Sequence, residues 1–208
     1  MLSVKNNGSF TDRAIQEHDL EVDWSPEVLS EIKEFVRFSR DRALGDCLDF
    51  TQLPFVTIDG VDSRDHDDAI FASKIDNGWS LQVAIADVSH YVRPGTGLDK
   101  TACSRGNSTY FVDRVIPMLP EALSNDLCSL RPDKNRLAIV CSISIAFTGS
   151  ILGWSFDQAW IRSRFRLTYN DVDQYFENNE GRFHGTWGKA VCESLEIVSQ
   201  VVLVCPPC

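Results

Sequence analysis

The sequence predicts an α+β fold in which antiparallel β-hairpins form a sheet packed with helices. Three stretches support this prediction. Residues 25–36 combine a helix-start signal with apolar residues at helical spacing, Asn77-Gly78 is a strong two-residue hairpin signal, and residues 137–147 alternate as a half-buried strand does. A chain of 208 residues can bury about 70% of its unfolded surface, so it needs neither disulfides nor a metal to hold a core.

Helix ends are visible in the choice of residues. Ser25 suits an N-cap, Pro26 suits the first helical position, and Gly45 and Gly106 suit the residue after a helix. Asn170 is expected to cap a further helix. The helices expected from these signals cover residues 26–44, 98–105, 120–127 and 170–177.

The strands are predicted from β-rich runs and from alternation. Asn77-Gly78 turns the chain within a hairpin of residues 69–86, and Thr148-Gly149-Ser150 turns it between two long strands. Because short turns join antiparallel neighbours, this order favours a sheet built from hairpins. The strands expected are residues 55–58, 69–72, 79–86, 137–147 and 151–165.

The chain divides into three parts. Residues 1–24 show little periodicity and are expected to be an irregular lead-in, whereas residues 25–177 form one domain. Residues 178–208 begin with a polar, Gly-rich loop and continue as an apolar stretch that stops at Cys205-Pro206-Pro207-Cys208. One Cys-x-x-Cys without a second pair is weak evidence for a zinc site, so this tail is expected to be a divergent or aberrant terminus.

Composition argues against several classes of protein. No stretch approaches the ~18 uninterrupted apolar residues of a membrane span, and residues 1–8 lack the apolar core of a signal peptide. The seven cysteines are odd in number and mostly irregular in spacing, which argues against a secreted disulfide scaffold. We therefore expect a cytoplasmic protein without a membrane partner.

The net charge of −10 lies in one segment. Residues 12–69 hold 16 acidic and 6 basic side chains, whereas the rest of the chain holds 14 of each. This balance argues against a general nucleic-acid coat, which is expected to be basic. The acids around residues 17–49 fit a solvated helix face and loops, but the last ten residues of the segment are different.

Residues 59–68, near the end of this segment, hold five aspartates between two predicted strands. Unpaired carboxylates this close repel one another, so one or more is expected to have a raised pKa. A divalent cation relieves the repulsion, and carboxylate oxygens favour Mg²⁺, Mn²⁺ or Ca²⁺ over Zn²⁺. Mg²⁺ held by a few carboxylates keeps positions for water and a substrate phosphate, which supports cleavage of phosphodiesters. The five are Asp59, Asp62, Asp65, Asp67 and Asp68.

Other interpretations of the cluster are weaker. A solvated acidic loop fits the composition, but the position between two apolar strands argues against it. A calcium loop that starts at Asp62 needs glycine and glutamate where the chain has Asp67 and Ser73. Asp65-His66-Asp67 fits the Asp-x-Asp site of metal-dependent glycosyltransferases, although three residues are not specific. In an extended chain His66 points away from its aspartate neighbours, so we do not expect it to act in catalysis.

Beyond the cluster, several separated stretches form a recognisable set. They are Thr57-Ile58-Asp59, Asp65-x-Asp67-Asp68-Ala69, residues 83–89, 91–94, 105–111, 115–120 and 123–130, and Arg166-Leu167-Thr168-Tyr169. In this order they resemble the RNase II/RNase R (RNB) family of exoribonucleases, over about residues 10–177. The Arg-Gly-x-Ser-x-Tyr-Phe stretch is more similar to RNase R than to RNase II.

The resemblance implies hydrolytic 3′→5′ degradation of single-stranded RNA to nucleoside 5′-monophosphates with Mg²⁺, or with Mn²⁺. It also implies that Asp59, Asp65, Asp67 and Asp68 hold the metal and that Asp65 and Asp67 act in catalysis. Tyr110 would stack on a base near the 3′ end of the RNA. Stacking on an aromatic ring tolerates any base and contributes ~1–3 kcal/mol.

The chain also departs from the family it resembles. Members are usually several times longer, with OB-type cold-shock domains before the catalytic domain and an S1 domain after it. The later half of the catalytic domain, with a further acid and an Arg-rich segment, has no counterpart, and the pattern fades after residue 177. We interpret the chain as the N-terminal half of an RNB catalytic domain and expect no processive digestion by it alone. The alternatives are completion by a second polypeptide and a non-catalytic remnant with weak RNA or metal binding.

Overall fold

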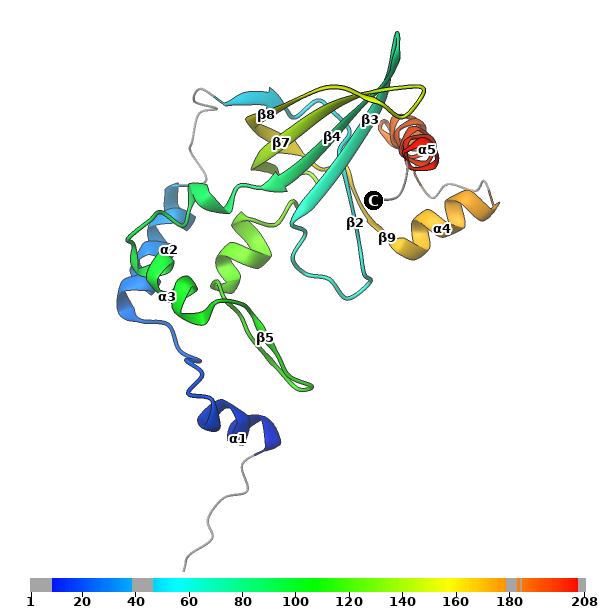
Figure 1. Cartoon of the computed structure of the whole chain (residues 1–208). Coiled ribbons are helices and arrows are strands. Elements are labelled where there is room, and N and C mark those ends of the chain that lie inside the picture. The colour runs from blue at the N-terminus through cyan, green and yellow to red at the C-terminus, as the bar shows by residue number, and fades with distance from the viewer. Residues whose placement is uncertain (1–8, 39–46, 179–182, 184, 206–208) are drawn as a thin grey trace, which may run out of the picture. The chain divides into compact units, whose positions relative to one another are not determined.

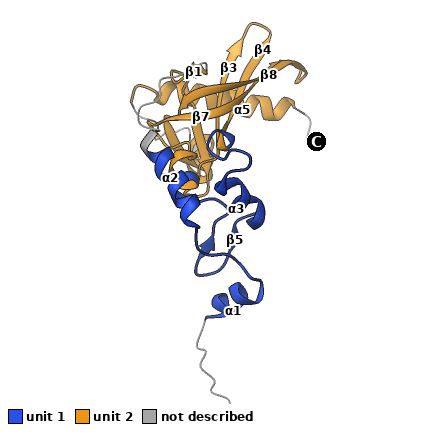
Figure 2. Ribbon diagram, turned by 90° about the vertical axis from the view of Figure 1, so that its left-hand side faces the viewer, with its two compact units in different colours: residues 1–40, 89–123 blue, residues 41–88, 124–208 orange. Residues whose placement is uncertain are grey.

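The structure, a computed structural model, describes residues 9–38, 47–178, 183 and 185–205. The chain forms two compact units, one from residues 1–40 and 89–123 and one from residues 41–88 and 124–208 (Figure 2). The second unit holds a large sheet with helices, and the first holds helices and a small hairpin. This combination confirms the α+β fold predicted from the sequence.

A mixed sheet forms the framework of the second unit (Figure 1). Its central strands run antiparallel, as the sequence predicts, but both outer strands pair in parallel, β1 with β8 and β9 with β2. Hairpin signals do not predict these parallel pairs because they join segments far apart in the chain. The strands in spatial order are β1 (Leu48–Phe50), β8 (Ile151–Arg162), β7 (Asn135–Ala146), β4 (Gly78–Ala86), β3 (Asp68–Ile75), β2 (Val56–Asp59) and β9 (Phe165–Thr168).

The two predicted hairpins are confirmed as β3–β4 and β7–β8. Gly78 follows the β3–β4 turn with φ of 157°, and a Cβ atom there would lie 1.9 Å from the carbonyl oxygen of Ile145 on β7. Because the neighbouring strand approaches so closely, the position requires glycine. The turn residue therefore also allows β4 to pair with β7.

The strand expected at residues 151–165 is two strands. β8 ends at Arg162, and the chain then leaves β7 and resumes as β9 beside β2. Between the two strands, the amide of Arg164 donates to the carbonyl oxygen of Phe55, 2.7 Å away. This bond holds the connection between β8, which lies near one edge of the sheet, and β9, which forms the opposite edge beside β2.

Two helices follow β9, and both differ from the sequence-based expectation. α4 (Tyr169–Asn178) is capped by Thr168 rather than Asn170. The hydroxyl of Thr168 accepts from the amide of Asp171 at 3.1 Å, and the Thr168 amide donates to the Asp171 carboxylate at 2.9 Å. This reciprocal pair is a capping box, which satisfies two amides at the helix start.

The tail expected to be aberrant contains α5 (Gly188–Val204), which packs against β3 and β4 (Figure 1). Val191 and Leu195 are fully buried against the sheet, and Ser194 accepts a hydrogen bond from the amide of Ala72 at 2.8 Å. The apolar stretch is therefore one face of a core helix, since it covers apolar residues of the sheet. Cys208 of the Cys-x-x-Cys stretch lies outside the described residues.

The first unit also corrects one expectation, because the lead-in contains helix α1. Ser9 and Asp12 form a capping box at its start, which holds the helix although none of its residues is buried. The predicted start of α2 is confirmed at Ser25, whose hydroxyl accepts from the amide of Val28, and the predicted stop of α3 is confirmed at Gly106. Gly45 lies outside the described residues. The elements are α1 (Phe10–Glu17), α2 (Pro26–Phe38), α3 (Gly97–Arg105), β5 (Thr109–Tyr110) and β6 (Val115–Ile116).

Two short helical turns lie where the chain passes between the units. η1 (Val88–His90) follows β4, and η2 (Leu123–Leu127) is a π-helical turn within the helix expected at residues 120–127. Within the described residues, no helix is both long and apolar enough to cross a membrane.

Candidate active site

The acidic cluster occupies the loop between β2 and β3. Asp59 is the last residue of β2 and pairs with Thr168 of β9, and Asp68 is the first residue of β3 and pairs with Ile85 of β4. Because β2 and β3 are antiparallel neighbours, both ends of the loop lie at the same end of the sheet. The sheet therefore brings together carboxylates that are nine residues apart in sequence.

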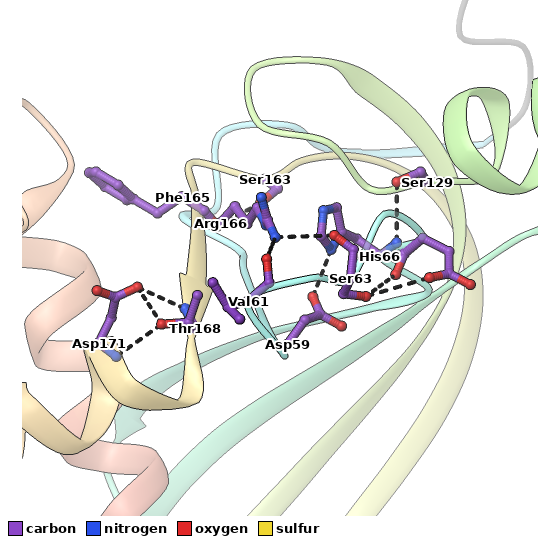
Figure 3. A network of polar contacts seen from close by, with 11 residues as sticks. Asp59, Val61, Ser63, His66, Ser129, Ser163, Phe165, Arg166, Thr168 and Asp171 are labelled. Carbon is purple, nitrogen blue, oxygen red and sulfur yellow. Dashed lines mark hydrogen bonds and ion pairs between the residues drawn. The ribbon is translucent and has the colours of Figure 1, made fainter. Parts of the chain in front are cut away.

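An arginine from β9 fixes the outer part of this loop (Figure 3). The guanidinium of Arg166 donates to the carbonyl oxygens of Val61, at 2.7 Å, and Ser63, at 3.1 Å. The hydroxyl of Ser63 in turn donates to the carbonyl oxygen of Asp65 at 3.0 Å. The exposed loop is thus tied to the sheet by a side chain more than a hundred residues later, which the sequence alone did not indicate.

His66 lies at the centre of the loop, and its imidazole faces Asp59 (Figure 3). The ring Nδ1 lies 2.8 Å from Oδ2 of Asp59, and the two side chains are 6% and 17% exposed. The sequence did not indicate this contact with Asp59. That contact needs the loop to fold back on the end of β2.

Two aspartates of the loop have raised pKa values, as their crowding predicts. Partial loss of solvent around the carboxyl group is the largest cause of the raised pKa of Asp67, followed by repulsion from Asp65, Asp68 and Asp59. Burial and repulsion from Asp59 also raise the pKa of Asp68. Electrostatic repulsion between these carboxylates therefore contributes to both raised pKa values.

The donor set suits a hard divalent cation. Carboxylate oxygens favour Mg²⁺ and Mn²⁺, and a cation lowers the repulsion that raises these pKa values. In the described part of the chain no three Asp, Glu, His or Cys side chains stand close enough to form a complete binding group. The residues that would hold a cation are the four aspartates given by the sequence: Asp59, Asp65, Asp67 and Asp68.

The candidate RNA-contacting residue belongs to the other unit. Tyr110 is on β5 of the small hairpin, and its side chain is 72% exposed. An exposed ring of this kind can stack on a base without cost to a core. The stacking role of Tyr110 therefore stays a prediction, and it does not depend on the acidic loop.

Known proteins share this arrangement of strands and motifs. The chain is 45% identical to ribonuclease R of Vibrio cholerae over 174 residues, which is 83% of this chain and 21% of that protein. It is also 45% identical to ribonuclease R of Escherichia coli over 166 residues, 79% of this chain and 20% of that protein. The chain thus spans about a fifth of the length of these relatives.

A solved structure agrees with the sequence relatives. Mycoplasma genitalium RNase R in complex with ribose-methylated single-stranded RNA superposes with a TM-score of 0.83 at 31% identity, covering 93% of this chain and 30% of that one. The model of the RNB domain family matches residues 48–201, so the family pattern includes α5 and runs beyond the expected limit at residue 177. With the acidic loop, the sheet and these relatives in agreement, the chain belongs to the RNB domain family.

Proposed function

We propose that this chain is the metal-binding part of a 3′→5′ exoribonuclease that hydrolyses single-stranded RNA to nucleoside 5′-monophosphates. The observation that carries the proposal is the loop from Asp59 to Asp68, whose carboxylates repel one another at the end of the sheet. Two things support it: the relatives at 45% identity are named ribonuclease R, and the similar Mycoplasma structure holds single-stranded RNA.

In this proposal Mg²⁺ or Mn²⁺ supplies the charge that polarises a phosphodiester and lowers the pKa of an attacking water. Asp59 and Asp68, each fixed at the end of a strand, supply oxygen atoms with little freedom to move. In the same proposal Asp65 and Asp67, from the loop itself, would act in catalysis as well as hold the cation. Arg166 holds the loop carbonyls of Val61 and Ser63, which keeps the loop from opening.

A segment exchange tests the proposal. The chain spans about a fifth of the length of its relatives. The segment of Escherichia coli ribonuclease R that matches this chain over 166 residues is therefore replaced by the corresponding residues of this chain. We expect the chimaera to shorten a 5′-labelled RNA from its 3′ end in Mg²⁺ and to release nucleoside 5′-monophosphates, identified by chromatography.

Asp67→Asn in the chimaera is expected to lower the rate at least ~10²-fold, since it removes charge at the reacting phosphate while keeping the shape. The matched control is Asp173→Asn, an exposed acid on α4, which should leave the rate unchanged. Full activity of the Asp67→Asn chimaera would contradict the proposal.

RNA contact through Tyr110 is tested separately. Tyr110→Ala in the chimaera should weaken binding of single-stranded RNA by about 1–3 kcal/mol because one stacking platform is lost. Tyr169→Ala, a second exposed tyrosine, is the control. Fluorescence anisotropy with a labelled RNA measures both, and equal losses for the two variants would remove the stacking role.

The alternative is a protein that only binds metal or RNA weakly. It is favoured by one observation: no complete metal-binding group is formed by the residues that the structure describes. An inactive chimaera that folds, and whose Mn²⁺ affinity is unaffected by Asp67→Asn, would support this alternative.

A further inference from the structure

His66 is the one buried residue of the acidic loop at residues 59–68. Its relative exposure is 5%, whereas the aspartates around it are partly or largely exposed. A buried imidazole is stable when its nitrogen atoms have partners, and here Nδ1 lies 2.8 Å from Oδ2 of Asp59. The ring is therefore a buried side chain with a carboxylate partner, in a loop whose other side chains are more exposed.

The direction of this hydrogen bond follows from the chemistry of the two groups. An ionised carboxylate only accepts hydrogen bonds, so the hydrogen is on Nδ1 of His66 and the ring donates to Asp59. The bond engages Oδ2 of the carboxylate and so restrains rotation of the group. Oδ1 of Asp59 is then held in one direction, and a cation can use it.

The main chain of His66 is held by two hydrogen bonds. Its amide donates to the hydroxyl of Ser129 at 3.2 Å (Figure 3), and its carbonyl oxygen accepts from the amide of Leu130 at 2.8 Å. Ser129 and Leu130 are themselves buried, at 0% and 1% exposure. These bonds fix the main chain at His66 against buried residues, so the imidazole extends toward Asp59 from a fixed point of the loop.

We propose that His66 is a positioning residue that orients the Asp59 carboxylate for a divalent cation. The inference rests on the proposed function, because it assumes that Asp59 is a metal ligand. Partners that orient metal ligands are typically worth 10–100-fold in metal affinity. His66 itself touches neither cation nor substrate in this account; it acts through Asp59.

The test measures Mn²⁺ binding to the full 208-residue chain by calorimetry. His66→Phe keeps an aromatic ring and removes the donor, whereas His66→Asn places an amide nitrogen where Nδ1 stands. We expect His66→Phe to weaken Mn²⁺ binding about 10–100-fold and His66→Asn to restore most of the affinity. His18→Phe, at an exposed histidine of the other unit, is the matched control and should bind as the unaltered chain does.

Thermal unfolding by circular dichroism confirms that each variant is folded, and His66→Met replaces His66→Phe if the latter is not. Mn²⁺ affinity that stays unchanged in the folded donor-free variant overturns the inference, as does equal weakening by His66→Asn. These results differ from failure of the proposed function, in which the unaltered chain itself binds no Mn²⁺ or binds it equally well after Asp67→Asn. That failure would overturn both.

Discussion

Two acidic regions of the molecule use the same side chain chemistry in opposite ways. In the N-terminal helices, carboxylates have partners: Asp12 completes the capping box with Ser9, and Glu31 accepts from the amides of Gly97 and Leu98 at 2.8 and 3.0 Å. In the loop after β2, by contrast, partial desolvation and then repulsion from neighbouring carboxylates raise the pKa of Asp67. In the first region the carboxylates accept hydrogen bonds at helix ends, and in the second they lie close enough to repel one another.

The contacts of the carboxylates distinguish the two acidic regions. Glu31 stabilises the start of α3, where helix amides lack partners within the helix. The loop carboxylates have no such role in the contacts found among the described residues, apart from the bond of Asp59 to His66 and the contact of Ser63 with Asp65. Both regions are rich in acidic residues. What marks the candidate cation site is that its acids lie together between two strands, whereas the others cap helices.

The largest expected difference between the regions is in cation binding. Asp59→Asn combined with Asp68→Asn keeps the shape of the loop and removes two oxygen ligands with their charge, so Mn²⁺ affinity should fall at least about tenfold. Glu17→Gln combined with Glu34→Gln removes two exposed acids from α1 and α2 and serves as the control. Calorimetric titration measures the Mn²⁺ affinity of both double variants. Equal affinities would contradict the claim that the loop carboxylates, and not the helix acids, bind the cation.

The next effect is on stability and belongs to the helices. Glu31→Ala removes a carboxylate that accepts two amides at the start of α3, and hydrogen bonds to charged groups contribute about 1.5–3 kcal/mol. We expect a loss of about 2 kcal/mol in the free energy of unfolding, measured with urea. Glu34→Ala, exposed on the same helix, should change it by less than about 0.5 kcal/mol.

The smallest effect has the opposite sign and belongs to the loop. Because folding raises the pKa of Asp67, the native state holds more protons than the unfolded state between about pH 4 and the raised value. Stability from this group therefore falls as pH rises through that window, and the full cost is present above it. Without metal, Asp67→Asn should be more stable than the unaltered chain at pH 7, by at most about 1 kcal/mol after solvent screening.

The check is a pair of urea titrations, at pH 7 and below pH 4. The gain from Asp67→Asn should disappear in acid, where the aspartate is protonated in both states. A gain that is equal at both pH values would mean that lost charge is not its cause.

Much of the sheet was predictable because its signals are local. The Asn77-Gly78 turn and the alternation of residues 137–147 specify the two central hairpins without help from the rest of the chain. The parallel partners β1 and β9 were not predictable in this way, since their pairing depends on segments that meet only in the folded chain. The break at Arg164 has the same origin: its amide is satisfied by Phe55, more than a hundred residues earlier.

The helix α5 was missed for a related reason. Its apolar residues looked like an aberrant tail, yet Val191 and Leu195 are buried because they pack in one cluster with Val56 of β2, Leu167 of β9 and Tyr175 of α4. In the site, the positions of the aspartates followed from their spacing. The roles of His66 and Arg166 did not, because each acts through a contact with a residue on another turn of the chain or another strand.

One measurement tests the central claim, that the loop accumulates charge in order to hold a cation. Thermal unfolding of the unaltered chain and of Asp67→Asn is compared at pH 7, with a chelator and then with Mn²⁺ at about 100 times its dissociation constant, which stabilises a binding protein by about 2.7 kcal/mol. We expect the order to reverse: Asp67→Asn is the more stable protein without metal, and the unaltered chain is the more stable with it. An order that stays the same in both conditions would contradict the account.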